Sequence, residues 1–352
     1  MCDIMGDSVE HGNAHQREKG ECDMAEFRVG IMGTGNIASQ MAVALNGLHA
    51  ADSEICSFAV ASRTQEKADE FAAKWHFQKA YGTYEELAAD PEIDLIYVAT
   101  PHAMHYENAR LCLEHGKNVL VEKAFTANAK QARELLRLSE EKKLFLTEAI
   151  WTRYMPSRQI VVNLLEQGII GEVTSLKATF NTPNFAIRRM HDPALAGGAL
   201  LDLGMYTLTF ASMFFGNDVE RMESRCRKYK TGVDATDHIR LFYRDGKKAE
   251  LMTSMTHLPK CEGILYGSRG KIRIQNINNF SRISVYEKKT RSWNDYEPPK
   301  QINGYEYEIL ACKRAIEAGQ IECEEMPHTE TLCMMQWMDE LRGQWGIVYP
   351  FE

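Results

Sequence analysis

The glycine-rich stretch from Gly30 to Ala38 is the feature that most constrains the fold of this chain. It follows the apolar residues 27–29 and precedes a helical pattern, which gives the order strand, turn, helix. The first turn of a helix carries partial positive charge and free backbone donors, so it binds phosphate groups. Gly33 permits the tight turn and Gly35 permits close approach of a pyrophosphate. The predicted cofactor contacts here are Gly33, Thr34, Gly35, Asn36 and Ile37.

Apolar strands alternate with amphipathic helices through the first half of the chain. The expected strands are continuous apolar runs, as parallel strands covered on both faces require. They are residues 27–31, 55–61, 95–99, 118–122 and 144–147. Because strands and helices alternate, the pattern predicts an α/β fold in which residues 26–150 form a doubly wound parallel sheet, a dinucleotide-binding Rossmann domain.

The pattern changes after residue 151. One helix begins near Pro156, and a second is expected over 329–342. Between them lie segments that alternate apolar and polar residues and are joined by turns. These segments are 173–181, 219–228, 238–243, 249–255, 263–267, 271–275 and 283–286. Residues 151–352 are therefore predicted to form an α+β domain with an open, mostly antiparallel sheet, whose exposed face favours a homodimer or higher oligomer.

Composition excludes several classes of protein. The 352 residues carry a formal net charge of −8 without a compensating basic stripe, which argues against nucleic-acid binding. We see no apolar run of membrane-spanning length, and residues 1–25 lack the apolar core of a secretory signal, so they are predicted to be a disordered leader. Nine scattered cysteines without a C-x-x-C motif favour free thiols and a cytoplasmic location.

The end of the second predicted strand bears on cofactor choice. Enzymes of this fold that use NAD place an acidic residue there to bind both ribose hydroxyls. This chain has Ser62 and Arg63 instead, and a hydroxyl with a guanidinium suits a 2′-phosphate. The sequence therefore favours NADP, with NAD still possible. The alternative is that Arg63 only begins an exposed helix and that selectivity is loose.

Two further groups follow strands at the same carboxyl edge, where ligands bind in such sheets. Thr100, Pro101, His102 and His105 come after strand 95–99, and we assign them to the nicotinamide side of the cofactor. The local pattern fits a loop proline with a helix-capping threonine equally well. The two histidines form a close pair but have no further ligand at metal spacing, so no metal site is expected.

Glu122 and Lys123 end strand 118–122 and are assigned to the cofactor as well. A lysine at this edge lies in the crevice, where its ammonium can polarise a hydroxyl or carbonyl oxygen. We therefore also assign Lys123 to catalysis. The alternative is a charge that simply returns to solvent at the end of a strand.

A third cluster lies in the segment 197–206, which reads GGALLDLGMY. Asp202 and Tyr206 are four residues apart, so they share one face of a helix. A tyrosine hydroxyl beside an ammonium can act as general acid or base. Both are therefore candidate catalytic and substrate-binding residues. The alternative is a buried tyrosine bonded to a capping aspartate.

Together, the glycine turn, the Glu-Lys pair and the segment 197–206 resemble the glucose–fructose oxidoreductase / inositol dehydrogenase / MocA family, from about residue 27 onwards. The resemblance implies a Rossmann domain followed by a domain with an open sheet, often used for subunit contacts. It implies hydride transfer between a nicotinamide cofactor and a CH–OH carbon of a small molecule. The residues around that carbon would be Lys123, Asp202 and Tyr206.

The segment 148–156, EAIWTRYMP, is similar to the branch of dimeric dihydrodiol dehydrogenases and NADP-linked D-xylose dehydrogenases. This implies a sugar, polyol or trans-dihydrodiol as substrate. Trp151 would stack on the substrate ring, and Arg153 would hold a hydroxyl group or a structural carboxylate such as Glu148.

One residue departs from the family pattern. Ala124 follows Lys123, where the family usually has a proline after a cis peptide bond. The direction of the lysine side chain is therefore left open by the sequence. The departure also keeps an alternative function in view, a catalytically weak NADP-binding redox sensor.

Overall fold

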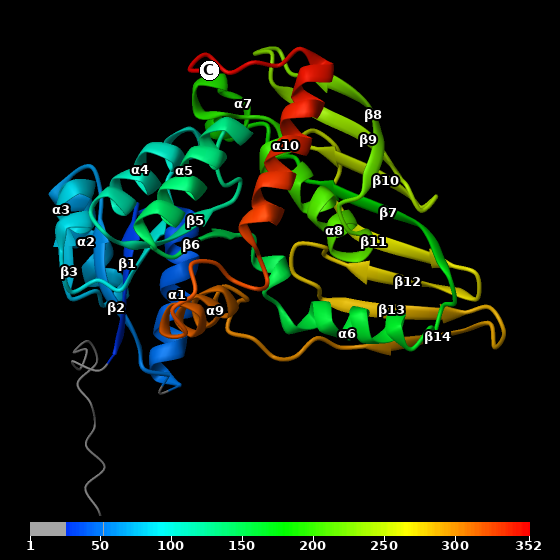
Figure 1. Ribbon diagram of the computed structural model, residues 1–352, viewed down its shortest axis with the longest axis horizontal. Coiled ribbons are helices and arrows are strands. Elements are labelled where there is room, and N and C mark those ends of the chain that lie inside the picture. Colours follow the sequence, from blue (N-terminus) through cyan, green and yellow to red (C-terminus); the bar gives the residue numbers. More distant parts are fainter. Residues whose placement is uncertain (1–25, 52) are drawn as a thin grey trace, which may run out of the picture.

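The computed structural model describes residues 26–51 and 53–352, so the predicted leader lies outside the described residues. Two sheets lie beside each other with helices packed around and between them (Figure 1). The alternating first half of the chain forms one sheet, and the second half forms the other. The predicted α/β fold with a second, mostly antiparallel sheet is therefore confirmed.

The first sheet has six parallel strands in the order β3-β2-β1-β4-β5-β6. The strands are β1 (Phe27–Met32), β2 (Ile55–Ala61), β3 (Lys79–Tyr81), β4 (Leu95–Val98), β5 (Asn118–Glu122) and β6 (Leu146–Ala149). The helices are α1 (Asn36–Ala50), α2 (Gln65–Trp75), α3 (Tyr84–Ala89), α4 (His102–Glu114) and α5 (Ala129–Lys142). The strand order reverses between β1 and β4, and such a reversal opens a crevice at the carboxyl ends of the strands.

The second sheet has eight strands in the order β14-β13-β12-β11-β7-β10-β9-β8. The strands are β7 (Val173–Asn181), β8 (Val219–Lys228), β9 (Asp234–Tyr243), β10 (Lys248–Ser254), β11 (Lys260–Gly267), β12 (Gly270–Gln275), β13 (Arg282–Glu287) and β14 (Ser292–Tyr296). Neighbours pair antiparallel except β7 and β10, which run parallel. The sequence did not predict β3 or β14, because one has three residues and the other is almost wholly exposed.

The helices of the second half are α6 (Pro156–Glu166), the short α7 (Arg188–His191), α8 (Met205–Phe215), α9 (Glu306–Glu317) and α10 (His328–Trp345), and α9 lies against α1 (Figure 1). Helix α8 packs on β7 and β10, while α10 contacts both β8 and α5 (Figure 1). The helical stretch Pro193–Phe215 is long and apolar enough to span a membrane, contrary to our expectation that no such run exists. It is 89% buried within the protein, as the core helix of a folded domain is.

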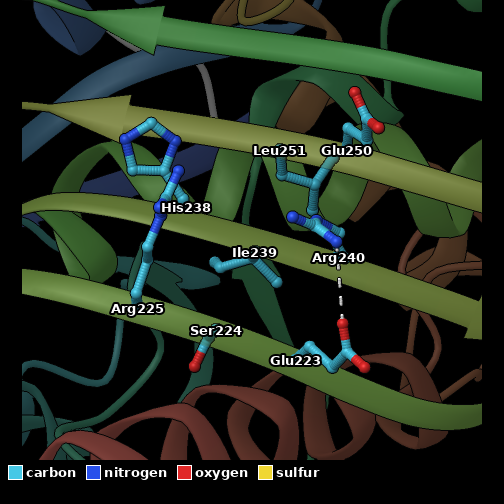
Figure 2. Close-up of a pocket in the computed structure, with 8 residues that line it drawn as sticks. All are labelled: Glu223, Ser224, Arg225, His238, Ile239, Arg240, Glu250 and Leu251. Atoms are coloured by element: carbon cyan, nitrogen blue, oxygen red, sulfur yellow. Dashed lines mark ion pairs between the residues drawn. The ribbon is translucent and has the colours of Figure 1, made fainter.

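The outer face of the second sheet is polar, because alternate side chains of β8, β9 and β10 point away from the helices. Figure 2 shows charged side chains of this face, among them Glu223, Arg240 and Glu250, around a shallow pocket of about 360 Å³. Arg240 Nη1 lies 3.8 Å from Glu223 Oε2. This face is thus lined by ion pairs rather than by an apolar patch.

Candidate active site

The glycine turn has the geometry that a dinucleotide phosphate requires. Gly33 has φ +114°, and a Cβ at this position would lie 2.9 Å from the Ala99 carbonyl oxygen. Gly35 caps α1 without any side-chain hydrogen bond, and a Cβ there would meet nothing within 4 Å. The first backbone N–H groups of α1 are therefore uncovered and free to bind an anion. The residues present fit a bound NAD(P) cofactor.

A cavity of about 380 Å³ opens from this turn along the carboxyl edge of the first sheet. It brings together most of the predicted cofactor contacts: Gly35, Asn36, Ile37, Thr100, Pro101, His102, Glu122 and Lys123. Arg189 and Leu195 from the second half of the chain close its other side. We call this cavity the cofactor cleft.

The end of β2 lies against the glycine turn. The hydroxyl oxygens of Thr34 and Ser62 are 3.2 Å apart, so both face the same space. Arg63 follows Ser62 and is exposed, two residues before α2 begins. The Ser62 hydroxyl thus lies beside the turn, where the adenosine ribose binds in this fold.

The two histidines behave differently from each other. His105 is fully buried, and its ring nitrogens lie 2.7 and 2.8 Å from the backbone oxygens of Thr100 and Ala124. Both nitrogens therefore face backbone oxygens, and His105 does not line the cofactor cleft. His102 does line the cofactor cleft, and burial lowers its pKa to about 3, so its ring is neutral.

Lys123, Asp202 and Tyr206 come together where the cleft meets the second half of the chain. Lys123 Nζ lies 3.2 Å from Asp202 Oδ1 and 5.0 Å from the centre of the Tyr206 ring. The same Asp202 oxygen is 2.8 Å from Arg189 Nη1. Burial alone would raise the pKa of Asp202, but the charges of Lys123 and Arg189 outweigh it and hold the pKa below its usual range. The Lys123–Ala124 peptide bond is cis.

The aspartate and the tyrosine sit on a helix, as predicted, but the helix is irregular. Asp202 lies in a π-helical turn, Leu200–Gly204, and Tyr206 lies in the first turn of α8. Burial raises the pKa of Tyr206 well above its ordinary value, so the phenol keeps its proton. Its ring packs against Phe180 with the ring centres 5.4 Å apart.

Glu122 lies on the cleft side of β5. The hydroxyl of Tyr97 donates a hydrogen bond to its carboxylate, and the backbone N–H of Lys123 donates to the other oxygen at 3.1 Å. Burial raises the pKa of Glu122 to about 7. This carboxyl group therefore exchanges its proton near neutral pH, directly beside Lys123.

The segment 148–156 divides between the site and the core. Trp151 stacks on Tyr305 with ring centres 4.4 Å apart. Arg153 is buried and pairs with Glu330 at 2.8 Å, so it holds a structural carboxylate, which is Glu330 and not Glu148. Its Nε also donates to the Glu325 backbone oxygen, and Arg153 does not line the cofactor cleft.

Phe180 and Tyr305 are residues of the site that carried no assignment from the sequence. Arg189 lies before the glycine pair, where the sequence indicates a residue that shapes the pocket but does not predict its direction. Phe180 occupies a strand position that is typical of a core residue. Tyr305 is distant in sequence from Tyr206 and belongs to no motif. Only the folded chain brings them together.

Comparison with known proteins decides the family. A family model described as an oxidoreductase family with an NAD-binding Rossmann fold matches residues 27–149, and the GFO/IDH/MocA C-terminal domain matches residues 159–273. The chain belongs to the GFO/IDH/MocA oxidoreductase family. The match confirms the resemblance drawn from the glycine turn, the Glu-Lys pair and the segment 197–206.

Both curated relatives and solved structures align with this GFO/IDH/MocA protein over most of its length. It is 38% identical to trans-1,2-dihydrobenzene-1,2-diol dehydrogenase of Xenopus laevis over 91% of this chain and 98% of the relative. The human enzyme of that name is 32% identical over 92% of this chain and 98% of the human enzyme. KijD10, a 3-ketoreductase from Actinomadura kijaniata in complex with NADP and TDP-benzene, superposes with a TM-score of 0.81 at 25% identity, over 90% and 97%.

Proposed function

We propose that this oxidoreductase is an NADP-preferring dehydrogenase or reductase that interconverts a CH–OH group and a carbonyl group. One observation carries the proposal: the Lys123 ammonium stands between the Asp202 carboxylate and the Tyr206 ring at the end of the cofactor cleft. An ammonium and a phenol beside a nicotinamide site can hold a substrate oxygen and move its proton.

The bound nicotinamide would supply or accept the hydride. During carbonyl reduction, Tyr206 donates its proton to the oxygen, and Lys123 holds that oxygen as negative charge develops on it. Asp202 anchors Lys123 and Arg189, which fixes the direction of the ammonium. Because the pKa of Tyr206 is raised, its phenol is protonated and suits the role of the acid in carbonyl reduction. Alcohol oxidation needs the reverse proton transfer, so it is favoured at higher pH.

The preference for NADP rests on Ser62 and Arg63. A hydroxyl next to the glycine turn and an exposed guanidinium suit a 2′-phosphate, and no carboxylate follows β2 directly to repel it. KijD10 binds NADP, whereas levoglucosan dehydrogenase was solved with NADH, so use of NAD also belongs to the proposal as a weaker activity.

The proposed substrate is a sugar, a polyol or a trans-dihydrodiol. Aromatic rings flank the Lys123–Tyr206 pair, namely Phe180 against Tyr206 and Trp151 stacked on Tyr305. Flat apolar walls of this kind bind the ring face of a carbocycle or a pyranose. Relatives named for a trans-dihydrodiol support the same class.

The test follows absorbance at 340 nm with NADP and with NAD, in both directions, against aldoses, inositols and trans-1,2-dihydrobenzene-1,2-diol. Turnover that is faster with NADP and is lost in Tyr206→Phe is expected. Tight NADP binding without turnover of any of these compounds would overturn the proposal and favour the redox sensor.

The remaining sequence predictions belong to the same proposal. Residues 26–150 would bind the cofactor, and residues 151–352 would complete the substrate pocket and form a homodimer through the outer face of the second sheet. A cytoplasmic location rests on composition alone. Sedimentation of the wild type and of Arg240→Glu tests the dimer, because the reversed charge lies on that face (Figure 2).

A further inference from the structure

A second cavity, of about 690 Å³, lies next to the aromatic residues Phe180 and Trp151. Phe180 and Trp151 form part of its wall. The rest is dominated by carboxamide side chains, from β7, from the turn between β12 and β13 and from the segment before α9. These are Asn181, Asn276, Asn278, Asn279 and Gln301. We call it the asparagine cavity.

A chain of aromatic contacts runs from the reacting groups to the asparagine cavity. Lys123 Nζ lies 5.0 Å from the Tyr206 ring centre, and the Tyr206 ring lies 5.4 Å from that of Phe180, which lines the cavity. On the other side, Tyr305 stacks on Trp151, which lines it too. A substrate whose reacting carbon sits at Lys123 and whose ring lies along these walls would extend toward the carboxamides.

The side chains that line the asparagine cavity are mostly polar and uncharged. Its one charged lining residue is Lys260, whose ammonium is already 2.8 Å from Glu262 Oε1. Asn181 is 6% exposed, and its Oδ1 is buried without a hydrogen-bond partner. A buried amide oxygen without a hydrogen bond destabilises the folded protein. A ligand that donates a hydrogen bond to this oxygen would remove the penalty and bind more tightly.

Carboxamides are suited to one class of ligand. A carboxamide has an acceptor oxygen and two N–H donors, which matches the donor and acceptor character of a hydroxyl group. Four of these amides, Asn276, Asn278, Asn279 and Gln301, use part of this capacity on neighbouring groups, whereas the Asn181 oxygen has no partner. An anionic group would need a free arginine or lysine, and an unsubstituted arene would gain nothing from the amides. Aromatic walls combined with a few placed amides are typical of sites for neutral ringed molecules.

We propose that the asparagine cavity is a subsite for a second, hydroxyl-rich ring of the substrate, with Asn181 donating and accepting hydrogen bonds to its hydroxyl groups. This rests on the proposed function, and within that substrate class it favours glycosides or disaccharides, whose second ring reaches the amides, over single rings that do not. The Lys123–Tyr206 pair reacts with the first ring, and the amides hold the second.

The experiment compares xylobiose, D-xylose and trans-1,2-dihydrobenzene-1,2-diol in the wild type and in Asn181→Ala. We expect the variant to raise KM for xylobiose about tenfold, as loss of one or two hydrogen bonds implies, with kcat nearly unchanged. KM for the diol should stay within about twofold, since the diol does not reach the amide. Asn294→Ala, on the exposed strand β14, is the matched control and should change neither value.

An equal rise in KM for all three compounds, or no rise for xylobiose, would overturn the subsite. Absence of turnover with every compound would instead refute the proposed function. In that case calorimetric titration of the NADP-loaded protein with xylobiose decides the subsite independently. Binding that is lost in Asn181→Ala supports it, and no binding to the wild type rejects it.

Discussion

A single oxygen of Asp202 holds both Lys123 and Arg189, at 3.2 and 2.8 Å. The two cations come from opposite sides of the cofactor cleft, one from the end of β5 and one from α7. Asp202 therefore fixes the lysine and at the same time joins the two halves of the chain at the site. The geometry of the Lys123–Tyr206 pair depends on this one buried carboxylate.

Replacing Asp202 with asparagine should lower kcat/KM about a hundredfold, because the ammonium loses its anchor and misplacement of a reacting group is costly. Steady-state kinetics at saturating NADP measures the loss. Asp218→Asn, which removes an exposed carboxylate paired with Arg244, is the control and should keep full activity. Unchanged activity in Asp202→Asn would show that the lysine does not need this partner.

Tyr206→Phe should leave the Kd for NADPH within about twofold and lower turnover by roughly 10²–10⁴, the usual range for lost acid–base catalysis. Only the phenol hydroxyl is removed, so packing against Phe180 is preserved. Single-turnover kinetics and cofactor fluorescence measure the two quantities. Tyr305→Phe, which retains the stack on Trp151, should keep most of the activity. Normal turnover in Tyr206→Phe would remove the tyrosine from the mechanism.

Arg63→Ala should weaken NADPH binding at least about tenfold and change NADH binding little, because only the 2′-phosphate gains from the guanidinium. Fluorescence titration with both cofactors measures the ratio. Arg291→Ala, which removes an exposed arginine far from the cleft, controls for the change in net charge. Equal weakening of both cofactors would contradict the assignment of Arg63.

The raised pKa of the Glu148 carboxyl group predicts that the stability of the folded protein depends on pH. Burial raises its pKa to about 8 from 4.5, so between these values the folded protein binds more protons than the unfolded chain. The contribution of Glu148 is therefore fully present at low pH and is lost as the pH rises toward 8. Glu122 changes stability in the same direction, because burial raises the pKa of its carboxyl group to about 7.

Melting temperatures at pH 5.5 and 8.5 test this. The wild type should lose more stability over that interval than Glu148→Gln, which has no proton to lose and can still accept the backbone hydrogen bond from Phe125. The same loss in both proteins would assign the pH dependence to other groups.

Much of the fold could be predicted from the sequence, because the sequence patterns that indicate it are local. The turn at Gly33 and Gly35 and the continuous apolar strands predicted the first sheet, and the alternating segments predicted most of the second. The four-residue spacing of Asp202 and Tyr206 correctly indicated a helix. It gave no sign of the π-helical turn at Leu200–Gly204, since that depends on packing.

The parts that sequence reasoning missed depend on contacts between distant residues. Arg153 has the position of a ligand-binding residue next to Trp151, yet its partner Glu330 comes from α10. His105 looks like a cleft residue until Thr100 and Ala124 are seen to take both ring nitrogens. The spacing of residues along the chain does not show that these groups contact each other, so neither role could be derived from it.

Helix α10 touches α5 beside the first sheet and β8 in the second. A wide hinge-like separation of the two sheets would have to break one of these packing surfaces. Entry and exit of a dinucleotide are therefore expected to involve small local movements of the segment around α7, which carries Arg189, while the two sheets keep their relative position.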